Sequence, residues 1–203
     1  MIIKQIPHGP IESNCYLIET QNATVLIDPC VSLSVLPAFK SPLKAIIVTH
    51  CHYDHISCME EIRSATKAPV YCHYLEFPSF KDSVKNGSSF FMMEESYQLP
   101  DNKVDDNDIL VIDEEFKLKF IHTPGHTMGS ICALLSDKDK DIALFSGDTL
   151  FKGSAGRTDL LGNPVLLMQS LMRLKQLDDS VIVYSGHGPQ STIGYEKLNN
   201  PFM

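Results

Sequence analysis

The sequence predicts a mixed α/β fold with two sheets and helices packed on their outer faces. Short apolar, β-branched runs recur along the chain, and two segments with apolar residues at helical spacing interrupt them. Hydrophobic residues make up 43% of the chain and charged residues 21%, which is typical of a globular protein. No repeat, low-complexity segment or linker divides the 203 residues, so we expect one domain over residues 1–203.

The first half of the chain combines strands with one helix. Its predicted strands are 15–20 (CYLIET), 24–28 (TVLID), 44–48 (KAIIV) and 69–73 (PVYCH). The segment 57–66 (SCMEEIRSAT) predicts a helix. Residues 74–108 are polar and irregular and contain the aromatic-methionine patch FFMM at 90–93, which indicates a helical excursion or a flap.

The second half repeats this alternation. Its predicted strands are 109–112 (ILVI), 117–123 (KLKFIHT), 130–136 (SICALLS), 141–147 (DIALFSG) and 180–186 (SVIVYSG). Residues 163–177 (NPVLLMQSLMRLKQL) predict a helix, with Pro164 in its first turn, where proline is tolerated.

Side chains that can bind metal follow four of these strands. The heptapeptide THCHYDH (49–55) comes directly after strand 44–48. His126, Asp148 and His187 lie just beyond the strands 117–123, 141–147 and 180–186, each beside a glycine. Loops at strand ends are where a rigid scaffold presents functional groups.

Five imidazoles and two carboxylates favour zinc or another borderline metal over calcium or magnesium, which prefer oxygen ligands. The candidate ligands are His50, His52, Asp54, His55, His126, Asp148 and His187. They are too many for one tetrahedral zinc and fit two metals that share a carboxylate. A single histidine at a strand end is usually a hydrogen-bonded polar residue, which we expect of His8, His73 and His122.

The net charge and the cysteines indicate which partners and which cellular compartment to expect. The net charge is −8 and no Lys/Arg cluster occurs, which disfavours nucleic acid as a partner. The N-terminus lacks the apolar stretch of a signal peptide, and no apolar run approaches the roughly 18 residues of a membrane span. We therefore expect no membrane partner. The six cysteines form no CxxC pair, so we expect reduced thiols and a cytoplasmic protein.

Along its whole length the chain resembles the metallo-β-lactamase superfamily. The motifs that carry the resemblance are HxHxDH, TPGHT, SGDTLF and SGHGP, together with SNCYLIE (13–19) and LIDP (26–29). The resemblance implies a four-layer αββα sandwich and two divalent metal ions per chain, zinc first, with iron or manganese as alternatives. It implies that His50, His52 and His126 hold one ion, that Asp54, His55 and His187 hold the other, and that Asp148 bridges them. Typical broad β-lactamases of the superfamily lack this bridge, which points away from antibiotic hydrolysis.

Within the superfamily, the chain is similar to the short, single-domain glyoxalase-II-like hydrolases. The similarity lies in DTLFKGSAGRTDL (148–160) and in the tail 186–202. The resemblance implies a thioesterase that cleaves hydroxyacyl-glutathione or a related small-molecule thioester through a hydroxide bound to both metals. Asp54 would then be catalytic, since it both ligates a metal and orients the hydroxide. A basic residue matching Arg157 faces glutathione in glyoxalase II, so Arg157 and Lys152 are candidate substrate-binding residues; alternatively, Arg157 pairs with Asp159 and braces its loop.

Other functions remain open. Persulfide dioxygenases of the superfamily keep these histidines and a GRTD stretch but use a single iron; their last ligand region usually reads His-Asp, whereas His187-Gly188-Pro189 favours the hydrolase. A nuclease of the same fold fits the acidic balance poorly, and a non-catalytic relic would be expected to lack a ligand. We interpret Cys51 and Cys58 as spectator thiols and Asp28 as a structural hydrogen-bonding residue.

Overall fold

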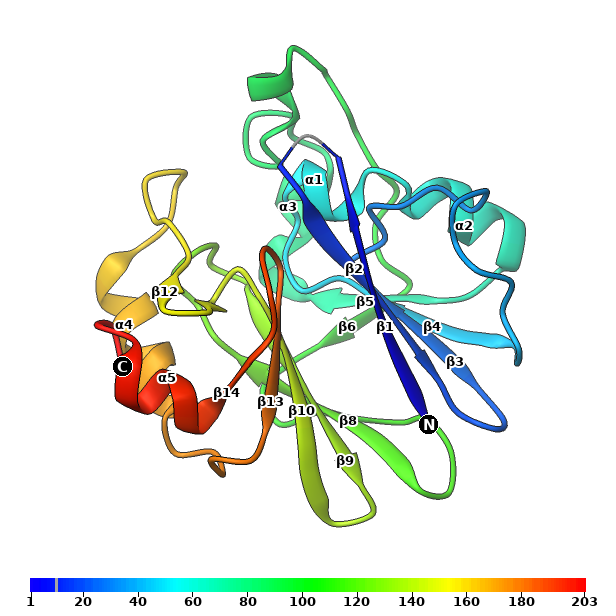
Figure 1. Cartoon of the computed structure of the whole chain (residues 1–203). Coiled ribbons are helices and arrows are strands. Elements are labelled where there is room, and N and C mark those ends of the chain that lie inside the picture. Colours follow the sequence, from blue (N-terminus) through cyan, green and yellow to red (C-terminus); the bar gives the residue numbers. More distant parts are fainter. Residues whose placement is uncertain (10) are drawn as a thin grey trace. The chain divides into compact units, whose positions relative to one another are not determined.

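The computed structural model describes residues 1–9 and 11–203, and these divide into two compact units, Met1–Val104 and Asp105–Met203. Each unit consists of a six-stranded sheet with helices (Figure 1). The predicted mixed α/β class with two sheets and accompanying helices is therefore confirmed. The organisation as one domain stays a prediction.

The first unit places its strands in the order in which they occur along the chain. Its strands are β1 (Ile2–His8), β2 (Ser13–Glu19), β3 (Thr24–Ile27), β4 (Leu43–Ile47), β5 (Val70–His73) and β6 (Asn102–Val104). Its helices are α1 (Tyr53–Ile56), α2 (Met59–Thr66) and α3 (Phe77–Phe80), with the 3-10 turns η1 (Tyr74–Glu76) and η2 (Ser88–Phe91). The strands β1 to β3 pair antiparallel and β3 to β6 pair parallel. The segments after β3 and β4 therefore leave the same end of the sheet.

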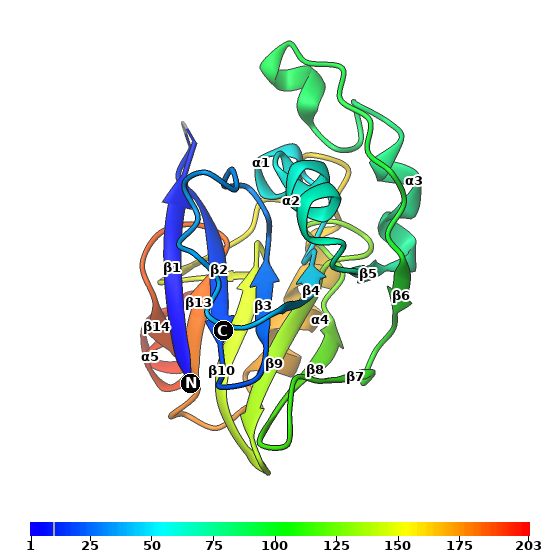
Figure 2. The ribbon, with the colours of Figure 1, turned by 90° about the vertical axis from the view of Figure 1, so that its right-hand side faces the viewer.

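The helices α1 and α2 cover one face of this sheet (Figure 2). Ile56, Met59 and Ile62 from the helices pack in one buried cluster with strand residues such as Leu26 and Ile46. At about 25 cal/mol per Å² of buried apolar surface, such a cluster is the main source of stability for a unit of this kind. The burial also fixes α1, which carries part of the histidine motif.

The irregular segment after β5 is tied to the same cluster at two points. Phe80 and Tyr97 are both buried in it, and the Tyr97 amide donates to the Phe80 carbonyl at 2.8 Å. The segment between them contains η2 and the patch at 90–93. The predicted excursion is thus confirmed as short helical turns, to which the strand β6 is added.

The second unit orders its sheet β14-β13-β10-β9-β8-β7. Its strands are β7 (Ile109–Val111), β8 (Phe116–His122), β9 (Ile131–Asp137), β10 (Lys140–Gly147), β13 (Ile182–Ser185) and β14 (Ser191–Thr192), with a separate two-stranded ribbon β11 (Leu150–Phe151) and β12 (Ser154–Ala155). Its helices are α4 (Pro164–Leu174) and α5 (Ile193–Asn199). Because β10 and β13 pair parallel, Asp148 and His187 follow strands that end at the same edge.

The helix α4 begins as its sequence predicts. The side-chain oxygen of Asn163 accepts hydrogen bonds from the Val165 and Leu166 amides at 2.9 and 3.2 Å, and Pro164 occupies the first turn. Its buried leucines pack against the sheet together with Ile193 of α5, and both helices lie on one side of that sheet (Figure 1).

The strand β1 and the helix α5 were not predicted. β1 contains only exposed and half-buried residues and includes Pro7, so its apolar pattern is weak. Its pairing with β2 stabilises it. α5 is only seven residues long and has glycine at its second position, which lowers its helix propensity. Among the residues that the structure describes, no helix has the length and apolar character needed to cross a bilayer.

Candidate metal centre

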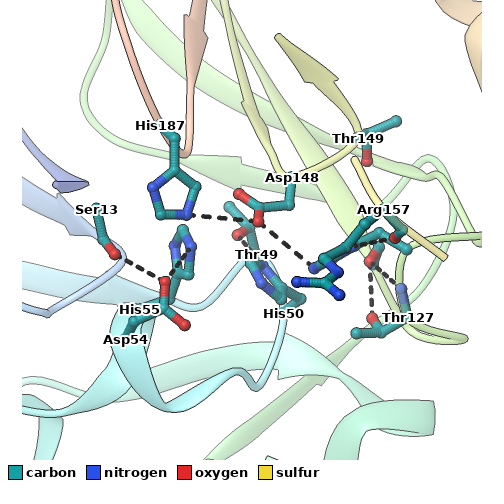
Figure 3. A network of polar contacts seen from close by, with 12 residues as sticks. Ser13, Thr49, His50, Asp54, His55, Thr127, Asp148, Thr149, Arg157 and His187 are labelled. Carbon is teal, nitrogen blue, oxygen red and sulfur yellow. Dashed lines mark hydrogen bonds and ion pairs between the residues drawn. The ribbon is translucent and has the colours of Figure 1, made fainter. Parts of the chain in front are cut away.

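The first unit brings four candidate ligands together after β4. His50, His52 and His55 are buried, and the His50 ring centroid lies 4.8 Å from that of His52 and 4.3 Å from that of His55. The His55 Nε2 lies 3.2 Å from Asp54 Oδ2 (Figure 3). Two ligand atoms on one tetrahedral zinc lie about 3.4 Å apart, since each is about 2.1 Å from the ion. The Asp54–His55 pair therefore has the spacing of two ligands on one metal.

Asp28 orients this cluster through hydrogen bonds to Thr49 and His55. It follows β3, at the same sheet end as the loop after β4, and its Oδ1 accepts from the Thr49 amide at 2.8 Å. Its Oδ2 accepts from the Thr49 hydroxyl at 2.7 Å and lies 3.1 Å from His55 Nδ1. A carboxylate only accepts, so His55 Nδ1 donates and the tautomer presents an unprotonated Nε2. The interpretation of Asp28 as a hydrogen-bonding structural residue is confirmed.

Two hydroxyls complete this support, and neither was anticipated from the sequence. The Thr49 hydroxyl donates to Asp28 and lies 3.1 Å from His50 Nδ1, so it accepts the proton of that nitrogen. The Ser13 hydroxyl donates to Asp54 Oδ2 at 2.7 Å, across 41 residues of sequence (Figure 3). Such outer contacts fix the direction in which each ligand points.

The second unit brings its three candidate ligands together on one carboxylate oxygen. Asp148 Oδ2 lies 3.5 Å from His126 Nε2. It also lies 3.5 Å from His187 Nε2 (Figure 3). Both separations match the roughly 3.4 Å expected for two ligands of one tetrahedral ion. The same oxygen therefore has a suitable spacing to serve one metal with His126 and another with His187, as a bridging carboxylate does.

Backbone groups fix His126. Its Nδ1 donates to the Arg157 carbonyl at 2.7 Å, which selects the tautomer with an unprotonated Nε2. The close approach of this loop depends on Gly156, because a Cβ atom there would lie 1.7 Å from the Asp148 carbonyl oxygen. A contribution from the main chain of Arg157 has no signature in the sequence.

The two candidate substrate-binding side chains, Arg157 and Lys152, both contact other residues of the second unit. The Arg157 guanidinium donates to both carboxylate oxygens of Asp159, at 2.6 and 2.5 Å, and both side chains are exposed. Hydrogen bonds from Arg157 lower the pKa of Asp159 to about 2. The Lys152 ammonium lies 5.3 Å from the centroid of the Tyr195 ring. The ion pair with Asp159 is the contact that the loop-bracing alternative for Arg157 requires. Substrate binding by Arg157 or Lys152 stays a prediction.

The other residues considered have ordinary structural roles. His73 Nδ1 accepts from the Leu75 amide, and His122 Nε2 lies 3.0 Å from the Met128 carbonyl, so both are hydrogen-bonded as predicted. Cys51 is fully buried, and burial raises its pKa, so it is an inert thiol. Cys58 is half-buried, and burial raises its pKa too.

The donor sets of both units suit zinc, iron or manganese, because imidazole and carboxylate ligands combine with tautomers that expose Nε2. The family model of the metallo-beta-lactamase superfamily matches residues 8–187, a span that contains all seven candidate ligands. The chain belongs to the metallo-beta-lactamase superfamily. The predicted resemblance is therefore confirmed at this level.

Two relatives are similar to the chain over nearly their whole lengths. One is the probable metallo-hydrolase YqgX of Bacillus subtilis, 33% identical over 98% of this chain and 96% of its own length. The other is the hydroxyacylglutathione hydrolase GloC of Haemophilus influenzae, 30% identical over 100% of this chain and 98% of its own.

Three solved structures resemble the chain. The BLEG-1 B3 metallo-beta-lactamase is 36% identical, covers 99% of both chains and has a TM-score of 0.89. TTHA1623 in a di-iron-bound form is 32% identical, covering 98% of this chain and 100% of its own, with a TM-score of 0.86. ETHE1 from Myxococcus xanthus is 29% identical over 99% of this chain and 84% of its own, with a TM-score of 0.77.

Proposed function

We propose that the chain is a metal-dependent hydrolase that cleaves small-molecule thioesters of the hydroxyacyl-glutathione type. The observation that carries the proposal is the oxygen of Asp148 at 3.5 Å from two histidine nitrogens, a spacing that suits a carboxylate shared by two metals. The substrate class is supported by the similarity to the hydroxyacylglutathione hydrolase GloC of Haemophilus influenzae.

The resemblance to this superfamily implies one dinuclear centre, and the matched span contains all seven candidate ligands. One ion would be held by His50, His52 and His126, the second by Asp54, His55 and His187, and both by Asp148. When bound, such a pair supplies Lewis acidity and a water of lowered pKa. Zinc is the first candidate, and the di-iron form of TTHA1623 supports iron as an alternative to zinc or manganese.

The chain's own residues then prepare the attack on the acyl carbon. Asp54, held by the Ser13 hydroxyl, orients the attacking water. Asp28 and Thr49 keep His55 and His50 in the tautomers that bind metal. Positions fixed in advance in this way avoid reorganisation during the reaction.

Two other activities have specific support. β-Lactam hydrolysis is supported by the 36% identity to the BLEG-1 B3 metallo-beta-lactamase, whereas the predicted aspartate bridge argues against it. Persulfide oxidation at a single iron is supported by the GRTD stretch at 156–159, which resembles that of the persulfide dioxygenases of the superfamily. Both would use histidines of the same set.

A substrate panel separates the three activities. Protein loaded with zinc or iron should hydrolyse lactoylglutathione or another thioester with a kcat/KM at least about tenfold above that for any β-lactam. Oxygen should not be consumed with glutathione persulfide. Faster β-lactam opening, or oxygen uptake on the persulfide without thioester cleavage, would replace the thioesterase proposal.

We further propose that the protein acts in the cytoplasm without a nucleic-acid partner. The six cysteines are free thiols, which suits a reducing compartment. The net charge of −8 is unfavourable for contact with phosphate backbones.

Arg157 provides a test of substrate charge. If its guanidinium binds a carboxylate of the carrier thiol, Arg157→Met should raise KM for an anionic thioester by roughly tenfold and leave a neutral thioester nearly unchanged. Exposed ion pairs are easily exchanged, so the contact with Asp159 does not prevent this role. Steady-state kinetics on both substrates measure the effect.

Asp159→Asn is the matched control, because it removes the ion pair and keeps the guanidinium. A substrate-binding Arg157 predicts an unchanged or lower KM for the anionic thioester in this variant. If Arg157→Met and Asp159→Asn instead lose activity equally on both thioesters and melt at lower temperature, the arginine braces its loop.

A further inference from the structure

A cavity of about 210 Å³ in the first unit has Asp54 in its wall. The wall also includes Ile11 and Ser13, Tyr53 at the start of α1, and Phe91 and Met93 of the excursion. The other described residues that line it are His8, Gly9, Cys30 and Ser57. Since Asp54 is a proposed ligand and orients the attacking water, a group that fills this cavity would lie beside the reacting carbonyl.

The lining is mainly apolar. Among the described residues that line the cavity, Asp54 is the one carboxylate, and lysine and arginine are absent. The Ser13 hydroxyl donates to Asp54, and the Ser57 hydroxyl donates to the Cys30 carbonyl, so both are already used. His8 is exposed at the end of β1. The cavity therefore offers little to an anionic or strongly hydrated group.

The aromatic part of the wall is formed before any ligand binds. The ring centroids of Tyr53 and Phe91 lie 5.7 Å apart. The Tyr53 amide donates to the Asn86 carbonyl at 2.7 Å, and the Asn86 side chain donates to the Glu95 carbonyl at 3.0 Å. These bonds hold the segment with Phe91 against α1, which lowers the entropy lost on binding.

We propose that this cavity binds the acyl group of the substrate and selects an apolar group of ring size, such as phenylacetyl, over acetyl. A cavity of about 150 Å³ is enough for a benzene ring, and this one is larger, at about 210 Å³. Two aromatic side chains suit an aromatic guest. The inference rests on the proposed hydrolase function, and it names the acyl half of the substrate.

Binding of the carboxylic acid products tests the cavity without turnover. Phenylacetate and acetate share the carboxylate, so a difference between their affinities for the metal-loaded protein measures the apolar group alone. NMR titrations should give a Kd for phenylacetate at least about tenfold below that for acetate. Phe91→Ala should abolish most of this preference.

Phe90→Ala is the matched control, because Phe90 belongs to the same turn η2, is 63% exposed and does not line the cavity. It should keep the full preference for phenylacetate. Met93→Ala and Met92→Ala form a second pair with the same logic, should Phe91→Ala fail to fold. Equal affinities for the two acids, or equal effects within both pairs, would overturn the proposal.

Kinetics separate this proposal from the proposed function. Phenylacetyl-glutathione should exceed acetyl-glutathione in kcat/KM by about tenfold or more, and Phe91→Ala should erase the difference. If no thioester is cleaved but phenylacetate still binds in the Phe91-dependent way, the thioesterase proposal fails and the apolar pocket stands.

Discussion

Asp148→Ala is expected to lower kcat/KM for thioester hydrolysis by about a thousandfold or more and to reduce the bound metal from two ions to one. The Asp148 Oδ2 lies 3.5 Å from both His126 Nε2 and His187 Nε2. If Asp148 bridges the metals, its loss removes a ligand from each ion and reduces the negative charge that compensates two cations, so one ion should be lost. Kinetics and elemental analysis of the same preparation measure both effects.

His73→Ala is the control for a buried histidine outside the site. Its Nδ1 accepts from the Leu75 amide at the start of η1, and the side chain is 1% exposed. The variant should lose stability and keep both metals and most activity. If His73→Ala and Asp148→Ala hydrolyse thioesters equally well, the bridging role of Asp148 is wrong.

Asp28→Asn is expected to weaken metal binding by about ten- to hundredfold. The Asp28 carboxylate accepts from the Thr49 amide, the Thr49 hydroxyl and His55 Nδ1. An amide nitrogen cannot accept, so one of these groups loses its acceptor. The backbone of Asp28 has a φ of 52°, which asparagine tolerates, so the variant tests the hydrogen bonds and not the fold. Competition with a chromogenic chelator gives the affinity.

Glu19→Gln is the matched control, since Glu19 is also a buried carboxylate of the first sheet. It pairs with Lys4 at 2.8 Å and accepts from the Lys40 amide at 3.3 Å, contacts that involve none of the candidate ligands. This variant should melt earlier and bind metal as the wild type does. Similar losses of metal affinity in Asp28→Asn and Glu19→Gln would mean that Asp28 acts only through stability.

The candidate ligands could be selected from the sequence because each follows a strand with a strong local pattern. The apolar run of β4 leads directly to His50, and β10 leads directly to Asp148. Strand ends and residue types are both local features, so one sequence is enough to recognise them.

The supporting contacts could not be predicted, because they join distant parts of the chain. Ser13 reaches Asp54 over 41 residues, and a serine of this kind has no distinguishing local pattern. The Arg157 carbonyl that holds His126 belongs to the main chain, which any residue could provide. The wall at Phe91 lies in an excursion without periodicity, so its place beside Tyr53 emerges only in the folded unit.

The metal content of the reconstituted protein tests the central claim most directly. Metal-free protein is incubated with excess zinc, iron or manganese, freed of unbound metal and analysed for bound ions per chain. A dinuclear hydrolase predicts close to two equivalents of at least one of these metals. A stoichiometry of one with every metal, together with oxygen uptake by the iron form on a persulfide, would contradict it and assign the protein to the dioxygenases.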